Sequence, residues 1–199
     1  MASLHLRKVT IGPSTHIIGL FGVTLTKALS PEALFTLLEP VMNASTVNIQ
    51  LMNADFIASQ DHLLFAAIHA LDAFHRGTNR ASTLPTEILR FAATQRQISK
   101  ALDTLGLDQH TKRMGGVLVN SDSSQLRQVY KAVLRVVPCN VTPEVLTITS
   151  SAKLAAIQEL FQITDLELEA TASSTSMSDH QQAVQKLIYD RCALLAITH

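Results

Sequence analysis

Residues 47–77 read VNIQLMNADFIASQDHLLFAAIHALDAFHRG, and they join a predicted strand to a predicted helix. Apolar and polar residues alternate from Val47 to Leu51, which places three apolar side chains on one face of a half-buried strand. Ser59 is typical of a helix N-cap, and Gly77 is typical of a left-handed helix end. The apolar residues between them recur at helical spacing: Leu64, Ala67, Ile68, Leu71 and Phe74. Each element has one apolar face to bury, so the pair predicts a layered α+β fold.

The same patterns predict elements on both sides of this stretch. Residues 17–23, IIGLFGV, are typical of a buried strand, and residues 30–32, Ser-Pro-Glu, are typical of a helix start. Two further helices are expected to meet at residues 92–94. Residues 117–119 predict a short strand, and an amphipathic helix follows over residues 126–137. This order favours a two-layer α+β sandwich, in which a small, mainly antiparallel sheet is covered by helices.

The last third of the chain is predicted to be helical with one interruption. The first apolar stripe consists of Leu154, Ile157, Leu160 and Phe161. The second lies on a helix capped by Ser178 with Gln181, and consists of Val184, Leu187, Ile188, Cys192 and Leu195. Residues 170–178, ATASSTSMS, show no periodicity, so we expect a flexible loop over residues 167–178. The length favours one domain over residues 1–199.

Composition limits the possible classes of function. Lys plus Arg and Asp plus Glu number 16 each, so no overall basic field attracts nucleic acid or membrane. No apolar run suits a signal peptide or a bilayer span, so we expect a cytoplasmic protein without a membrane partner. Cys139 and Cys192 are too far apart in sequence for a metal-ligand pair and are expected to be reduced thiols. Neither phosphate-binding glycine motifs nor a nucleophile elbow occurs, so we expect no catalytic residue and no cofactor.

Histidines are the remaining candidates for metal or acid–base chemistry. His62 and His69 lie on one predicted helix, and His75 lies at its end. Metal-binding helices usually combine an i, i+4 pair with a third ligand, and the H-E-x-x-H pattern is absent. We therefore expect no metal site. An enzyme that uses His69 or His75 is an alternative, which elemental analysis or turnover by the purified protein would support.

Residues 90–100, RFAATQRQISK, combine positive charge with amide groups at a predicted helix start. The polar side chains concerned are Arg90, Gln95, Arg96, Gln97 and Lys100. Together with free N–H groups at a helix start, they suit the phosphate oxygens and base edges of single-stranded RNA. A structural explanation is also open, because Thr94 and Gln97 have the spacing of a capping box and the cations suit a solvated face.

Three segments resemble a known family. They are Asn53 to Asp55 before Ser59, the helix from Leu63 to Phe74, and TEILRFAATQRQISKALDTLGL over residues 86–107. They are similar to the kinase-binding subunits of the KEOPS tRNA-modification complex, also called EKC, the family of human TPRKB. Archaeal members carry a very similar E-I-L-x-x-A-x-x-Q-R-Q-I-x-x-A-I run. The clear resemblance covers residues 47–134, whereas the segment 167–178 is longer and richer in Ser and Thr than the family implies.

The resemblance implies a non-catalytic protein that binds the atypical PRPK-type kinase, an ATPase, of the complex. Through that kinase it would reach the transferase that installs threonylcarbamoyl on the adenosine beside the tRNA anticodon. By analogy with the family's helical surface, the predicted kinase-binding residues are Leu154, Ile157, Leu187 and Ile188. In a eukaryote the protein would also be nuclear.

In archaeal relatives the subunit also binds the single-stranded CCA end of tRNA, through the region that matches residues 95–98 here. The resemblance therefore implies that tRNA binds at Arg90, Gln95, Arg96, Gln97 and Ile98, with Lys100 contributing charge. A stand-alone RNA-binding module without a kinase partner is the alternative function.

Overall fold

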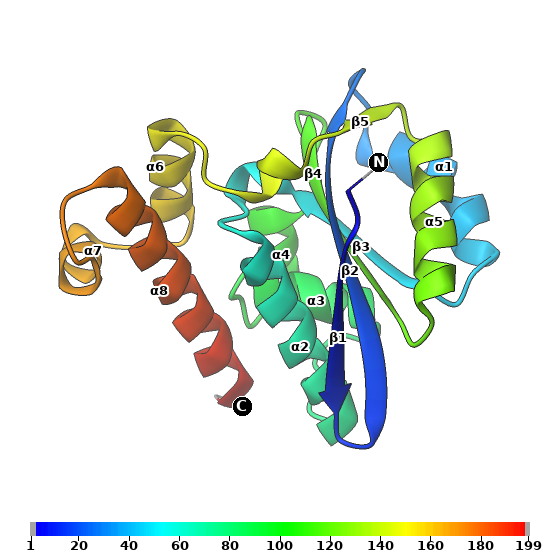
Figure 1. Ribbon diagram of the computed structural model, residues 1–199, viewed down its shortest axis with the longest axis horizontal. Helices are drawn as coiled ribbons and strands as arrows, with labels where there is room; N and C mark the ends of the chain where they lie inside the picture. The colour runs from blue at the N-terminus through cyan, green and yellow to red at the C-terminus, as the bar shows by residue number, and fades with distance from the viewer. Residues whose placement is uncertain (1–2, 198–199) are drawn as a thin grey trace.

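A computed structural model describes residues 3–197, and within them five strands form one antiparallel sheet (Figure 1). The strands are β1 His5–Ile11, β2 Ser14–Leu25, β3 Asn48–Asn53, β4 Arg113–Asn120 and β5 Cys139–Val141. Their order is β1-β2-β4-β3, and β5 pairs with the end of β2. The predicted α+β fold, with an antiparallel sheet packed against helices, is confirmed.

The same residues form eight α-helices and two short 3₁₀ helices. They are α1 Pro31–Asn43, η1 Ala54–Phe56, α2 Gln60–Arg76, α3 Leu84–Ala92, α4 Ile98–Leu105, α5 Ser123–Val136, η2 Pro143–Leu146, α6 Ser151–Leu160, α7 Asp165–Thr171 and α8 Met177–Ile197. The hydroxyls of Ser30 and Ser59 cap α1 and α2 as predicted. Gly77 ends α2 with φ 68°, a conformation that costs glycine little.

Helices cover both faces of the sheet, whereas the sequence patterns predict helices over one face. Side chains alternate along β2, so Ile18 and Leu20 join the core beneath α2 and α3. Phe21 and Val23 join the core beneath α1 and α5. Burial on two faces explains why this strand reads as a continuous apolar run.

Two strand features escape sequence patterns. β1 is an edge strand with Arg7 and Lys8 exposed, so it lacks an apolar signal. β4 begins at Arg113, four residues before the predicted strand, because Gly115 and Gly116 weaken its pattern. A Cβ atom at Gly116 would collide with the ring of Phe21, so close packing explains that glycine.

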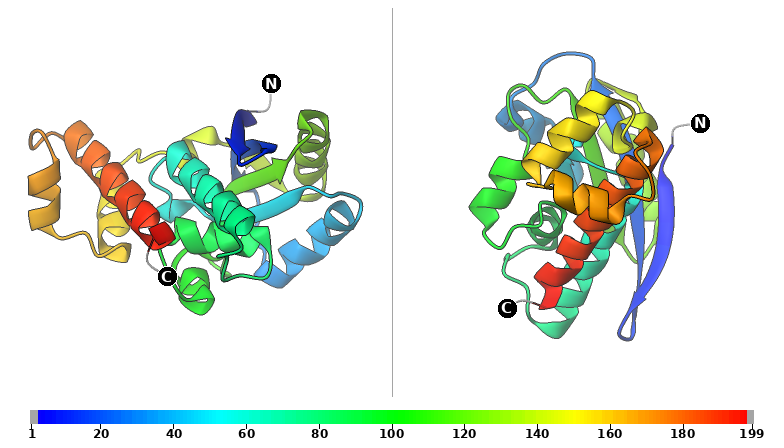
Figure 2. Two further views of the ribbon diagram at one scale, coloured as in Figure 1. Left: turned by 90° about the horizontal axis from the view of Figure 1, so that it is seen from below. Right: turned by 90° about the vertical axis from the view of Figure 1, so that its left-hand side faces the viewer.

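Helices α6, α7 and α8 form a group at one end of the molecule, opposite α1 and α5 (Figures 1 and 2). α7 occupies the first part of the segment predicted as a loop, because Thr164 and Glu167 form a capping box at its start. Residues 172–176 are left without a helix, and their flexibility stays a prediction. α8 begins at Met177, and the Ser176 hydroxyl accepts the Asp179 N–H group, so the predicted cap at Ser178 is wrong. None of the helices in the described residues is long and apolar enough to span a bilayer.

Candidate nucleic-acid interface

An open groove of about 580 Å³ lies between the start of α4, the end of α6 and the last turns of α8. Its lining residues are Thr94, Gln95, Arg96, Lys100, Leu160, Phe161, Gln162, Arg191, Leu194 and Leu195. Three of these are cations, and none of the lining residues in the described chain is Asp or Glu. The groove therefore combines positive charge, amide groups and apolar surface, which suits a single-stranded nucleic acid.

A second groove, of about 630 Å³, lies between α1 and α5 on the other side of the sheet. Its lining residues are Val41, Asn43, Ala44, Ser45, Thr46, Gln125, Gln128, Val129 and Ala132. None of these residues of the described chain is charged, so this slightly larger groove offers no cation to a phosphate. Charge, and not size, identifies the first groove as the candidate site.

Two lining residues have left-handed backbone conformations. Thr94 has φ 51° and Gln162 has φ 53°, and no other non-glycine residue within 3–197 has positive φ. Each follows the end of a helix in a Schellman motif. After α3, the Thr94 N–H group donates to the Phe91 carbonyl at 3.0 Å, and the next N–H group reaches back to Arg90 at 3.1 Å. After α6, Gln162 donates to Glu159 at 3.0 Å in the same way.

The capping box predicted for Thr94 and Gln97 is therefore wrong. Thr94 ends α3 and does not begin α4. Gln97 occupies the N-cap position of α4, but its side chain makes no capping hydrogen bond. Helix ends of this kind usually carry glycine, so a threonine gives no sequence signal for one. Left-handed residues other than glycine cluster at functional sites, and here two of them meet in one groove.

Replacing Thr94 or Gln162 with glycine is expected to raise the free energy of unfolding by about 0.5–1 kcal/mol. The Cβ atom makes this conformation cost about 1–2 kcal/mol, and glycine avoids that cost. The gain in stability is smaller than this, because glycine loses more conformational entropy on folding. Urea unfolding of each variant measures the change. Alanine at the same positions keeps the Cβ atom and should give a smaller gain than glycine, so equal gains with alanine would contradict this explanation.

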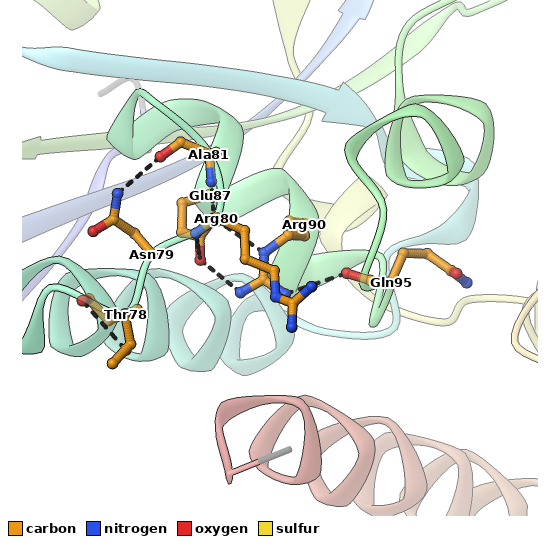
Figure 3. A network of polar contacts seen from close by, with 8 residues as sticks. Thr78, Asn79, Arg80, Ala81, Glu87, Arg90 and Gln95 are labelled. Atoms are coloured by element: carbon orange, nitrogen blue, oxygen red, sulfur yellow. Dashed lines mark hydrogen bonds and ion pairs between the residues drawn. The ribbon is translucent and has the colours of Figure 1, made fainter. Parts of the chain in front are cut away.

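Arg90 belongs to a buried network and does not line the groove (Figure 3). Its guanidinium donates to both carboxylate oxygens of Glu87, at 3.0 and 2.6 Å. The two side chains are 4% and 0% exposed. Glu87 also accepts the N–H group of Ala81 at 2.9 Å, and Arg90 donates to the Gln95 carbonyl at 3.5 Å. The arginine predicted to contact tRNA therefore fixes the loop that carries Gln95, and its charge is already neutralised.

The other predicted tRNA-binding residues differ in their position. Arg96 and Lys100 are exposed and line the groove, and Gln95 lines it while half-buried. Gln97 is exposed and Ile98 is half-buried, and neither is a lining residue. The structure thus brings three of the six predicted residues together around one space. Contact of any of them with RNA stays a prediction.

The predicted kinase-binding residues lie mostly in the core. Leu154, Ile157 and Ile188 are at most 5% exposed and pack with side chains of α2 and α3. Leu187 is half-buried and packs against the same core. An apolar stripe marks the buried face of a helix, so the same signal that suggested a binding face also fits the core. Direct contact between these residues and a kinase stays a prediction, and Leu187 offers the most surface for it.

Arg191 is the groove residue that sequence reasoning missed. Its guanidinium donates to the carbonyl oxygens of Phe161 and, at 3.4 Å, Gln162. It also pairs with the Glu167 carboxylate at 2.8 Å. Hydrogen bonds from Thr164 and from Arg191 lower the pKa of Glu167 to about 2, so this carboxylate is charged at neutral pH. Arg191 lies far from Arg96 in sequence, and only the packing of α8 against α6 places both in the lining of one groove.

The histidines His62 and His69 and the thiol of Cys192, which lie outside the groove lining, have structural contacts or a pKa that disfavours reactivity. The buried ring of His62 bonds to the backbone of Ala58 and Ala92, and His69 stacks on Phe91 with ring centroids 5.7 Å apart. Within residues 3–197, no group of three or more His, Cys, Asp and Glu side chains is placed to hold a metal ion. Burial raises the pKa of the Cys192 thiol to about 12, which disfavours the reactive thiolate.

Comparison with known proteins gives one family. Residues 27–196 match the model of the family described as kinase binding protein CGI-121. No curated protein gives a significant match to the chain. The family match spans every residue that lines the groove.

Proposed function

Because the chain belongs to the CGI-121 family of kinase-binding proteins, we propose that it is a non-catalytic subunit of a KEOPS complex that binds a kinase and recruits tRNA. The kinase of this proposal is the atypical PRPK-type ATPase, which links the subunit to the threonylcarbamoyl transferase. The complex would act in the cytoplasm, and also in the nucleus if the organism is eukaryotic. The family match supports the kinase-binding part over a stand-alone RNA-binding module.

The observation that carries the tRNA-binding part is the charge of the groove. Arg96 and Lys100 project from the α3–α4 connection and α4, and Arg191 joins them from α8. Phosphates supply the affinity of most nucleic-acid interfaces, and amide groups such as that of Gln95 can reach base edges. A single-stranded tRNA end fits these requirements, because its bases are not paired and its backbone is accessible.

Kinase binding is proposed for the exposed surface of α8 next to the buried stripe. Ile197 is 72% exposed and Leu187 is half-buried, so both offer apolar surface to a partner. Apolar side chains at the centre of an interface contribute much of the binding energy. In this proposal Leu154, Ile157 and Ile188 hold α6 and α8 in place from within the core.

Arg96→Glu is expected to weaken binding of a tRNA that ends in CCA by about tenfold or more at low salt. The change removes one phosphate contact and adds repulsion. The negative slope of log affinity against log salt should therefore become shallower, by at least about 0.7. Fluorescence anisotropy over a series of salt concentrations measures both quantities. The same tRNA without its CCA end should bind weakly to either protein.

Arg127→Glu is the matched control, because Arg127 is exposed on α5 across the sheet and does not line the groove. It makes the same change in net charge and should leave the affinity within about twofold, since distant exposed charges are screened. Equal effects of the two reversals would exclude the groove as the tRNA site.

A further inference from the structure

The groove contains one cation whose charge is already paired in the free protein. Arg96 and Lys100 are exposed, whereas the Arg191 side chain is 26% exposed and is held by Glu167. Its bonds to the carbonyls of Phe161 and Gln162 fix the guanidinium at the end of α6. Arg191 is therefore placed and oriented beside the other two cations before any ligand arrives.

Glu167 performs two tasks with its two carboxylate oxygens. Oε2 accepts the Thr164 N–H group at 2.8 Å and closes the capping box of α7. Oε1 accepts from Nη2 of Arg191 at 2.8 Å. The first task needs only an acceptor, and a glutamine can perform it. The second task places a negative charge on the cation of the groove, although Glu167 is not itself a lining residue.

We infer that Arg191 is a third phosphate-binding residue of the groove. In the unbound protein the Glu167 carboxylate occupies its guanidinium, and the phosphate of a single-stranded RNA end competes with this carboxylate for Arg191. This inference rests on the proposed tRNA-binding function. A guanidinium has five N–H donors, and its bonds to the two carbonyls can persist while the carboxylate is replaced by a phosphate oxygen. Glu167 thereby lowers the affinity of the groove for anions and keeps Arg191 oriented in the unbound protein.

The placement of Gln162 supports this role for Arg191. Its left-handed backbone turns the chain after α6 so that the carbonyls of Phe161 and Gln162 both face one guanidinium. The same turn places the Gln162 side chain in the groove lining. The strained turn after α6 and the Arg191 side chain from α8 thus meet at one position that can bind an anion.

Glu167→Gln is the decisive variant, because it removes the charge and keeps an acceptor for the cap of α7. We expect the full-length variant to bind tRNA about two- to fivefold tighter than the unaltered protein, since an exposed ion pair of this kind has a modest energy. The matched control is Glu169→Gln, an exposed glutamate on the same helix that is not paired with Arg191. The control should bind tRNA as the unaltered protein does.

Arg191→Met is expected to weaken tRNA binding and to decrease the salt slope by about 0.7, the value for one phosphate on a single strand. In the Arg191→Met background, Glu167→Gln should no longer tighten binding. Circular-dichroism melting shows whether the arginine variant keeps its fold, and the Glu167 and Glu169 pair decides the matter if it does not.

The inference is overturned if Glu167→Gln binds tRNA no tighter than Glu169→Gln. If Glu167→Gln has no such effect but Arg96→Glu weakens binding in the same assay, only the role of Arg191 is lost and the proposed function remains intact. If Arg96→Glu is also without effect, the tRNA-binding function fails and this inference fails with it.

Discussion

Arg90→Ala is expected to lower the free energy of unfolding by about 3–5 kcal/mol, because it leaves the Glu87 carboxylate buried without its partner. Glu87 is fully buried on α3, and it would lose the two hydrogen bonds that Arg90 donates. The variant also loses the bond to the Gln95 carbonyl. The loop that begins the groove should therefore lose its fixed position.

Urea unfolding of Arg90→Ala measures this loss, and Arg96→Ala is the matched control. Arg96 is exposed a few residues away, so its removal should change stability by less than about 0.5 kcal/mol. A loss below about 1 kcal/mol for Arg90→Ala would contradict the importance of the buried pair. Weaker tRNA binding by an Arg90 variant should accordingly be interpreted as a displaced loop and not as a lost phosphate contact.

Acidification from pH 6.5 to pH 4 is expected to destabilise the protein by about 3 kcal/mol through His62 alone. Burial lowers the pKa of His62 to about 4, and the Ala92 carbonyl offsets only part of this effect. The unfolded chain binds the proton near pH 6.5, whereas the folded chain binds it only near pH 4. The contribution of His62 is therefore complete above pH 6.5 and is lost as the pH falls through this window.

The hydrogen bonds of His62 give the physical reason. Nδ1 accepts the Ala58 N–H group at 3.3 Å, so the proton of the neutral ring lies on Nε2, which donates to the Ala92 carbonyl at 2.8 Å. A second proton on Nδ1 would face an N–H donor inside the core. Burial also lowers the pKa of His16 and His69, so they add to the loss in the same direction.

Unfolding free energies of the unaltered protein and of His62→Gln, measured from pH 7 to pH 4, separate the contribution of this residue. The variant should be less stable at pH 7 and should lose less stability on acidification. His110→Gln, which replaces an exposed histidine, is the control for the loss of a histidine as such. An unchanged pH dependence in His62→Gln would mean that the folded protein accommodates the charged ring.

Local signals explain which parts of the fold the sequence predicts. The caps at Ser30 and Ser59 and the glycine end of α2 each depend on one or two residues, and all three are found. The alternation in residues 47–51 predicts β3 because one of its faces is buried. β1 gives no comparable signal, because an edge strand carries charged side chains and its pairing depends on a distant segment of β2.

The site was predictable only where its residues are adjacent in sequence. Arg96 and Lys100 stand in one polar segment, and the structure places both in the groove. Arg90 belongs to the same segment, but its neighbour Glu87 on the same helix face takes it into the core. Arg191 could not be assigned to the site from sequence, because only the packing of α8 beside α6 brings it there. The burial of Leu154 and Ile157 shows that an apolar stripe alone does not separate a core face from a binding face.

Affinity purification of the tagged protein from its native host, performed in parallel with Arg96→Glu, tests the central claim most directly. The proposed function predicts that the unaltered protein recovers an atypical kinase, the threonylcarbamoyl transferase and tRNA. The variant should recover the same two proteins with much less tRNA, because α8 and its proposed kinase surface are unchanged. Recovery of tRNA without a kinase would favour a stand-alone RNA-binding module. Recovery of neither the kinase nor tRNA would contradict the proposed function.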